Sequence, residues 1–193
     1  MRKKLICVEG RTCSGKDSLV NAMIQKYPEV LKPVISRTTR PMREGEQNGV
    51  EHWFHTKEEF DRIMEINKDN IVAYTQIKNE NDTDGYEYFT MKEDLEDANI
   101  YIIDPNGVKY LKSRTDLDMD IWVIYVYASD DVRRERAKKS RSDYETEYEK
   151  RVLKEKAQFD EAEKNFEFDY LVKNEDSFEN SLNKFEFYLR HIL

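Results

Sequence analysis

The chain has 193 residues, a formal charge of −8 at pH 7 and 37% charged side chains. This acidic balance argues against a nonspecific grip on nucleic acid, and the length suits one compact domain or a core with small insertions. The apolar runs are too short for a signal peptide or a membrane span, and two cysteines without a disulfide framework fit a reducing compartment. We therefore expect a cytoplasmic protein with no nucleic-acid or membrane partner.

The first predicted elements are a short buried strand, Leu5–Val8, and a helix that runs to about Lys26. Between them, Gly10, Gly15 and Lys16 have the spacing G-x-x-x-x-G-K of a phosphate-binding loop. Glycine lets backbone N–H groups close around a phosphate, the helix N-terminus favours an anion, and the lysine adds a point charge for the outer phosphates. We predict a nucleotide phosphate site here. The alternative is a chance spacing in which Gly15 only ends a loop.

One position departs from the usual loop pattern. Asp17 stands where a serine or threonine normally meets Mg²⁺, and Ser18 follows one position later. A carboxylate beside a triphosphate is repelled unless a cation lies between them or it points away, and Asp17 also suits the positive end of a helix. We predict Asp17 and Ser18 as metal ligands. The residues predicted to bind ATP in this loop are Gly10, Arg11, Thr12, Cys13, Ser14, Gly15, Lys16, Asp17 and Ser18.

The next predicted strand, Pro33–Ser36, is indicated by its β-branched residues. A polar loop rich in glycine and proline follows, and it carries Arg37, Arg40 and Arg43. Arginines held on a rigid loop can bind one phosphate through two parallel N–H groups. The alternative for this segment is a solvated basic loop.

The segment Ser36–Gly49 reads S-x-T-T-R-x-x-R-x-G-E-x-x-G and resembles the monophosphate-binding segment of guanylate kinases. The phosphate loop before it and the elements after it stand in that family's order, so the resemblance covers essentially the whole chain. It implies that Ser36, Arg40 and Arg43 bind the phosphate of a nucleoside monophosphate. It also implies that ATP, with Mg²⁺ as cofactor, is the phosphoryl donor.

A capping box at Thr56–Glu59 then opens a helix, and two strands are predicted at Ile71–Ile77 and Gly85–Thr90. In guanylate kinases this pair of strands carries residues that contact the acceptor nucleotide. By the resemblance, Tyr88 matches a phosphate-contacting tyrosine, and Thr90 matches a base-contacting serine or threonine.

Two positions depart from the family pattern in this region. Ala73 stands where the family's base-reading glutamate aligns, and His52, still a predicted monophosphate ligand, stands where its first phosphate-contacting tyrosine aligns. A glutamate that accepts from guanine N–H groups is a main source of base discrimination, so we predict relaxed specificity for guanine. The alternative is an acidic reader of the base from the longer turn between the strands: Glu80, Asp82 or Asp84.

A helix is predicted from the capping box Thr90–Glu93 to about Asp97, and the strand after it, Ile100–Asp104, ends in a carboxylate. Ligands gather at the carboxyl ends of strands in open α/β sheets. Asp104 also matches a family aspartate near the phosphates and the metal, although Ile102 replaces a second aspartate of that pattern. We predict Asp104 as a catalytic, metal-binding residue. A helix cap before the following proline is the alternative.

The most strand-like run of the chain, Ile121–Tyr127, is expected at the centre of the sheet. Helices are predicted at Asp130–Lys139 and from a cap at Ser142–Glu145 to about position 165. A last strand, Tyr170–Asn174, and an amphipathic helix, Ser177–Leu193, end the chain. Both tryptophans are expected in the core.

Two arginines of this region matter through the resemblance. Arg141 and Arg151 match arginines of a mobile lid that guanylate kinases bring onto the transferring phosphoryl group, and Asn174 matches an asparagine near the adenine. Because the spacing here does not align without gaps, Arg134 and Arg136 stay open as alternatives. A run of charges on a helix is more often a solvated face.

The alternation of strands and helices predicts an α/β fold with a mainly parallel sheet. The resemblance implies a sheet of the P-loop NTPase type with helices on both faces, a small monophosphate-binding insert and a lid. We expect a single domain whose parts are the core at 1–36, 90–132 and 151–193, the insert at 37–89 and the lid at 133–150.

The function implied by the resemblance is that of a nucleoside monophosphate kinase, which converts GMP or dGMP and ATP to GDP or dGDP and ADP. One alternative is a kinase resembling ribose 1,5-bisphosphate phosphokinases, whose phosphate loop is similar to Lys16–Leu19 and which need no base pocket. Another is a noncatalytic guanylate-kinase-like binding module, against which the intact Gly15 and Lys16 argue. The sequence leaves the oligomeric state open.

Overall fold

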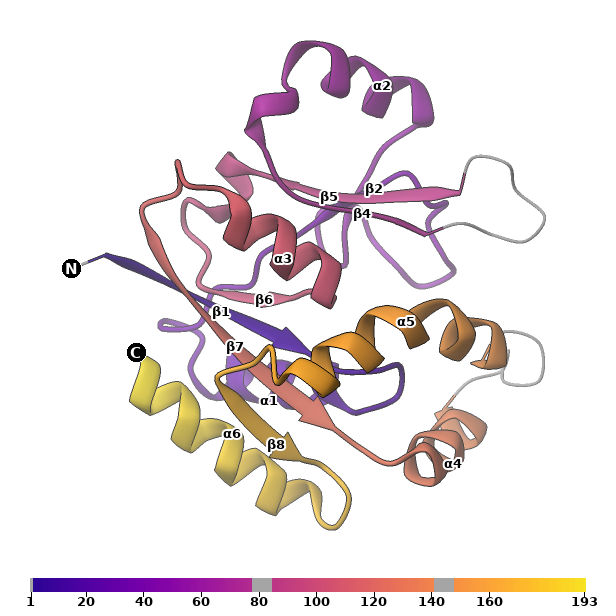
Figure 1. Ribbon diagram of the computed structural model, residues 1–193, viewed down its shortest axis with the longest axis vertical. Coiled ribbons are helices and arrows are strands. Elements are labelled where there is room, and N and C mark those ends of the chain that lie inside the picture. The colour runs from indigo at the N-terminus through magenta and orange to yellow at the C-terminus, as the bar shows by residue number, and fades with distance from the viewer. Residues whose placement is uncertain (1, 78–84, 141–147) are drawn as a thin grey trace. The chain divides into compact units, whose positions relative to one another are not determined.

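The computed structural model describes residues 2–77, 85–140 and 148–193 (Figure 1). Its Cα positions divide the chain into two compact units. The predicted insert, 37–89, lies within the second unit, which also takes in neighbouring residues on both sides. The first unit consists of Met1–Lys32, Asn99–Pro105 and Asp118–Leu193, and the second of Pro33–Ala98 and Asn106–Leu117.

The first unit is built on a four-stranded parallel sheet, which confirms the predicted sheet type. Its strand order is β6-β1-β7-β8, and every neighbouring pair is parallel. The longest pairing joins β1 to β7 from Lys3 opposite Met119 to Glu9 opposite Tyr125. The strands are β1 (Lys3–Glu9), β6 (Ile100–Ile102), β7 (Met119–Tyr127) and β8 (Tyr170–Lys173).

Helices cover both faces of this sheet, as predicted. Side chains that alternate along the strands point to opposite faces. On one face, strand residues such as Val8 and Val126 pack with α1 (Lys16–Lys26) and α6 (Phe178–Ile192) in one buried cluster. On the other face, the ring of Tyr125 lies 6.1 Å from that of Phe159 on α5 (Glu149–Asn165). The remaining helix of this unit is α4 (Asp130–Ser140).

The second unit has its own sheet, of order β3-β2-β5-β4, in which β2 and β3 are parallel and the other pairs antiparallel. The predicted capping box at its helix α2 is confirmed, because Thr56 Oγ1 accepts from Glu59 N and Glu59 Oε2 accepts from Thr56 N. The elements are β2 (Arg37–Thr38), β3 (Trp53–Phe54), α2 (Lys57–Ile66), η1 (Lys68–Asn70), β4 (Ile71–Ile77), β5 (Tyr86–Met91), η2 (Lys92–Leu95) and α3 (Pro105–Ser113).

Three local predictions differ from the structure. The strand expected at Pro33–Ser36 begins only at Arg37, where the chain first pairs with β5 and β3. The helix expected after Thr90 is the short η2, because Thr90 remains in β5 and the carboxylate of Asp94 accepts from the N–H of Met91 instead. The helix α3, which begins directly after Asp104, was expected only in the alternative that treats Asp104 as a helix cap.

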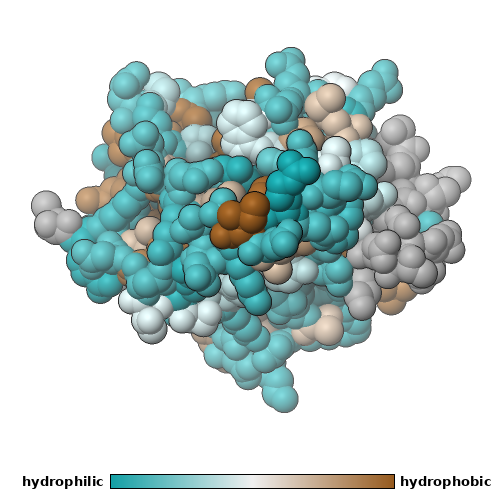
Figure 2. All heavy atoms as spheres, turned by 90° about the horizontal axis from the view of Figure 1, so that it is seen from above, coloured by the Kyte–Doolittle hydropathy of each residue, from teal (hydrophilic) through white to brown (hydrophobic). Residues whose placement is uncertain are grey.

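The surface also departs from one expectation. Trp53, expected in the core, is 40% exposed, and its ring lies against Gly49, where an added Cβ would approach it to 2.7 Å. Figure 2 shows a face that is largely hydrophilic, in keeping with the high content of charged residues. Within the described residues, no helix combines the length and the apolar character needed to cross a membrane.

Candidate functional site

The phosphate loop in the first unit has the backbone geometry that its glycines predict. It joins the end of β1 to the start of α1, and Gly15, the N-cap of α1, has a φ of +90°. A Cβ at Gly10 would lie 2.6 Å from the carbonyl oxygen of Val126, so no side chain fits there. Cys13 also has a positive φ, of 60°. The loop can therefore turn its N–H groups toward a bound anion.

Contacts from β8 and α4 hold the carbonyl side of this loop. The side-chain amide of Asn174, which is buried, donates to the carbonyl oxygen of Ser14 at 2.8 Å, and Arg136 donates to the same oxygen at 2.9 Å. Arg136 also donates to the backbone carbonyl of Asn174. The structure thus brings Asn174 to the loop, and Arg136 joins it there.

The basic and acidic groups at the start of α1 lie together. Lys16 Nζ is 3.3 Å from a carboxylate oxygen of Asp17, whose side chain is 66% exposed, and Ser18 is exposed beside them. Asp104 follows β6, which ends at the same edge of the sheet as β1, since Ile103 N donates to the carbonyl of Val8 at 3.2 Å. The structure therefore places Asp104 at the ligand-binding edge of the parallel sheet.

The oxygen donors at this edge suit Mg²⁺, which takes one or two carboxylates and completes its shell with water and phosphate oxygens. No group of three or more histidines, cysteines, aspartates or glutamates that would bind a metal by protein ligands alone occurs among the residues described. A metal here therefore needs the oxygens of a bound phosphate. Asp17 and Ser18 at the start of α1 and Asp104 after β6 carry oxygen donors of the kind that Mg²⁺ takes.

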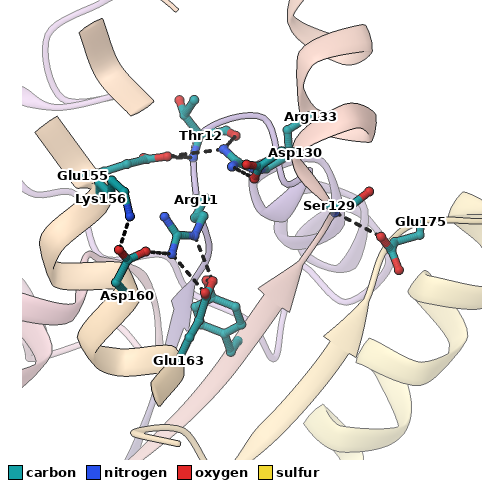
Figure 3. Close-up of polar contacts among 11 residues, drawn as sticks. Arg11, Thr12, Ser129, Asp130, Arg133, Glu155, Lys156, Asp160, Glu163 and Glu175 are labelled. Carbon is teal, nitrogen blue, oxygen red and sulfur yellow. Dashed lines mark hydrogen bonds and ion pairs between the residues drawn. The ribbon is translucent and has the colours of Figure 1, made fainter. Parts of the chain in front are cut away.

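The helix α5 approaches the phosphate loop from the other side (Figure 3). The backbone N–H of Thr12 donates to both carboxylate oxygens of Glu155, each at 2.9 Å. Arg11 donates to Asp160 and to both oxygens of Glu163 over distances of 2.7–2.9 Å. Burial alone would raise the pKa of Glu163, but the hydrogen bonds from Arg11 and Tyr125 outweigh it and lower that pKa. Arg11 is therefore an anchor for α5.

Of the two predicted lid arginines, Arg141 and Arg151, the structure describes one. Arg151 lies in the first turn of α5, whereas Arg141 falls outside the described residues. A further arginine, Arg133 on α4, is buried to 1% exposure and donates to the carbonyl oxygen of Thr12. Neither Arg133 nor Glu155 was predicted, because the charged helices that carry them give no sequence signal for a contact with the loop.

In the second unit, three predicted monophosphate ligands meet on one face of the sheet. Ser36 Oγ and His52 Nδ1 are 2.9 Å apart, and the rings of His52 and Tyr88 lie edge to face with centroids 5.8 Å apart. Burial lowers the pKa of His52, and the charge of Arg40 lowers it further, which favours the neutral imidazole. A neutral imidazole beside two hydroxyls offers a phosphate hydrogen bonds rather than a fixed charge.

An ion pair between the buried Arg40 and the partly exposed Glu46 lies next to these residues. Arg40 is 7% exposed and donates from both terminal nitrogens to the two carboxylate oxygens of Glu46, at 2.7 and 2.9 Å. The backbone N–H of Arg43 donates to Glu46 as well, while the Arg43 side chain is exposed. These bonds, first the one from Arg40, lower the pKa of Glu46 to about 2. Glu46 was missed, although the motif R-x-x-R-x-G-E contains it.

The predicted base-reading position has no polar side chain. Ala73 is 2% exposed and lies opposite Thr90 in the pairing of β4 with β5. Glu87 is buried nearby, but its neighbour Tyr88 faces the ligand side, so Glu87 faces the opposite side, where Tyr74 donates to it. The acidic residues of the turn, Glu80, Asp82 and Asp84, fall outside the described residues.

Comparison with known proteins gives one consistent family. The family model described as guanylate kinase matches residues 2–192. The guanylate kinase of Caldanaerobacter subterraneus subsp. tengcongensis is 30% identical over 176 residues, which cover 89% of this chain and 80% of that protein. The guanylate kinase of Mycoplasma genitalium is 27% identical over 187 residues, or 94% of this chain and 72% of that protein. A crystal structure of guanylate kinase from Anaplasma phagocytophilum has a TM-score of 0.68 at 20% identity, covers 98% of this chain and 86% of that chain, and shares the fold.

Proposed function

This chain belongs to the guanylate kinase family and is a phosphotransferase that phosphorylates GMP. We propose which of its residues bind the donor, which bind the acceptor and which act on the transferring phosphoryl group. The observation that carries the proposal is the phosphate loop, whose left-handed turn at Gly15 presents backbone N–H groups and Lys16 at the start of α1. ATP is the phosphoryl donor, and GDP and ADP are the products.

The donor half of the reaction belongs to the first unit. The loop N–H groups and Lys16 bind the outer phosphates of ATP, and the backbone of the loop already has the turn that this binding needs. Mg²⁺ that enters with ATP would be held by Asp17, Ser18 and Asp104 and would offset the phosphate charge. Asn174 and Arg136 position the loop by holding the carbonyl of Ser14.

The acceptor half belongs to the second unit. Ser36, His52 and Tyr88 supply hydrogen-bonding groups for the acceptor phosphate, and Arg40 and Arg43 supply the positive charge. The Nε of Arg40 is buried and makes no hydrogen bond to any described residue, so it is an available donor for that phosphate. Thr90 contacts the base.

The transferring phosphoryl group needs further positive charge. Arg141 on the lid at 133–150 and Arg151 on the helix after it offset the charge that develops on this group in the transition state. Closure of that lid excludes water and so limits wasteful hydrolysis of ATP.

The two alternatives have less support. A kinase for ribose 1,5-bisphosphate needs no base-contacting residue such as Thr90 on the ligand face of the sheet. A noncatalytic module needs no intact phosphate loop. The relatives named above are guanylate kinases, which favours neither alternative.

The test of the proposal is Lys16→Ala in a coupled assay of ADP release. Removing one preorganised donor to a transferring group lowers kcat by about 10²–10³-fold, so we expect at least that loss without a change in the folded state. The exposed Lys164 on α5 supplies the matched control, because Lys164→Ala removes a lysine away from the loop. Turnover of Lys16→Ala at the wild-type rate would remove Lys16 from the mechanism and contradict the proposed function.

A further inference from the structure

An internal carboxylate already lies on the phosphate loop. Both carboxylate oxygens of Glu155 accept from the backbone N–H of Thr12 at 2.9 Å (Figure 3). A nitrogen of Arg133 lies 3.5 Å from the same carboxylate, and Lys16 is close enough to stabilise its charge. A backbone N–H of the loop and two cations thus converge on Glu155, and these are the kinds of group with which such a loop binds a phosphate.

The position of Glu155 follows from the way α5 is anchored. Glu155 and Glu163 are eight residues apart, so they lie on one face of the helix, two turns from each other. Glu163 and Asp160 accept hydrogen bonds from Arg11, the residue before Thr12. The helix α5 therefore contacts two consecutive loop residues, Arg11 and Thr12. The helix therefore presents Glu155 to the loop and not to solvent, with its side chain 15% exposed.

Burial and the neighbouring N–H and cationic groups have opposite effects on the charged carboxylate of Glu155. Burial raises the pKa of Glu155 on balance, although the N–H of Thr12 and the charges of Lys16 and Arg133 act in the opposite direction. A triphosphate brings more charge and more acceptor oxygens than one carboxylate, so it is the stronger ligand for the same groups. The carboxylate of Glu155 and a triphosphate at the same N–H also repel each other. Both cannot occupy the N–H of Thr12.

We propose that Glu155 is a built-in competitor for the donor phosphates, which the triphosphate must displace from Thr12 when it binds. This inference rests on the proposed function. Arg151 lies four residues before Glu155 and therefore on the same face of α5, one turn away. Release of Glu155 removes a contact that holds this turn of α5 to the loop, and so couples arrival of the donor to the freedom of an arginine for the transferring group.

The competition reduces the apparent affinity for the donor by the fraction of molecules in which Glu155 has left the loop. Glu155→Gln keeps the side-chain shape but removes the charge, so its amide competes less well for Thr12. We expect Glu155→Gln and Glu155→Ala to bind inorganic pyrophosphate and ADP about five- to tenfold more tightly than the wild type, from the net strength of one charge-assisted hydrogen bond reduced by burial.

Titration calorimetry with pyrophosphate and with ADP, together with thermal unfolding of the unliganded protein, tests this inference. The control is Glu161→Gln, which removes an exposed glutamate from the same helix. We expect tighter binding for both Glu155 variants without a large loss of Tm for Glu155→Gln, because burial already disfavours the charged carboxylate. A residue that only supported the fold would lower the Tm and weaken binding, and that outcome overturns the inference, as does unchanged affinity.

The same experiment separates the inference from the proposed function. Wild-type protein that binds ADP, with Glu155 variants no tighter, refutes the competitor and leaves the kinase proposal intact. Wild-type protein that binds neither pyrophosphate nor ADP refutes the donor site, and the competitor with it.

Discussion

Replacing Glu46 with glutamine should destabilise the second unit, because it removes the charge that balances the buried guanidinium of Arg40. The carboxylate of Glu46 receives both terminal nitrogens of Arg40 and the N–H of Arg43, and Arg40 is only 7% exposed. Glutamine has nearly the same shape, but its amide has one neutral acceptor oxygen, so it cannot accept from both terminal nitrogens of Arg40 as the carboxylate does. The variant therefore isolates the charge.

The expected magnitude follows from the pKa of Glu46. That pKa is about 2 in the folded chain against an ordinary value of 4.5, and this difference is worth about 3 kcal/mol of folding free energy at neutral pH. Loss of one partner from a fully buried ion pair costs about 3–5 kcal/mol, and we expect the low end here because the Glu46 side chain is 16% exposed. Because the folded pKa is depressed, the stabilisation is fully present above pH 4.5 and is lost as the pH falls toward 2.

The assay is urea unfolding of the wild type and of Glu46→Gln at pH 7 and at pH 3, followed by circular dichroism. At pH 7 the variant should lose about 3 kcal/mol, and at pH 3 the gap should narrow to less than half of that, about 1.4 kcal/mol. Glu44→Gln, two residues away and exposed, should stay within about 0.5 kcal/mol of the wild type at both values. A gap that is absent at pH 7, or equally wide at both, would refute the reasoning.

Two further variants test the acceptor site. Arg43→Ala removes an exposed side chain, so it should raise KM for GMP about 10- to 100-fold, from a lost contact of about 1.5–3 kcal/mol, and leave ATP binding and stability unchanged; a fall in ATP affinity would assign Arg43 to the donor site. Ala73→Glu should raise the preference for GMP over AMP by about one to two decades in kcat/KM, measured for GMP, dGMP, AMP and IMP. If the wild type already prefers GMP over AMP by several decades, another acidic group reads the base, and the candidates are Glu80, Asp82 and Asp84.

Local patterns in the sequence were sufficient for the elements that depend on neighbours in the chain. The strand before the phosphate loop, the left-handed glycine that starts α1 and the capping box at Thr56 all follow from contacts within a few residues. The parallel sheet follows from the alternation of apolar strands and helices, because only crossover connections allow that order. Family resemblance added the order of the motifs along the chain.

The same local logic explains the errors. The strand expected at Pro33–Ser36 was placed by β-branched content, but pairing with β3 and β5 decides where a strand begins, and that starts at Arg37. Trp53 was expected in the core by its residue type alone. Its 40% exposure depends on its position over Gly49, in a loop whose fold no periodicity predicts.

The sequence by itself determined the α/β fold and located the glycine-containing loop at the start of α1, and it predicted an arginine-rich acceptor segment. Only the tertiary structure decided which side chains meet at the loop. Glu155 reaches Thr12 across 143 positions, and Asn174 reaches Ser14 across 160. Such contacts depend on how α5 packs against the sheet and on where β8 joins it, and both are properties of the whole chain. A helix presents the same charged face in sequence whether it meets solvent or an anion site.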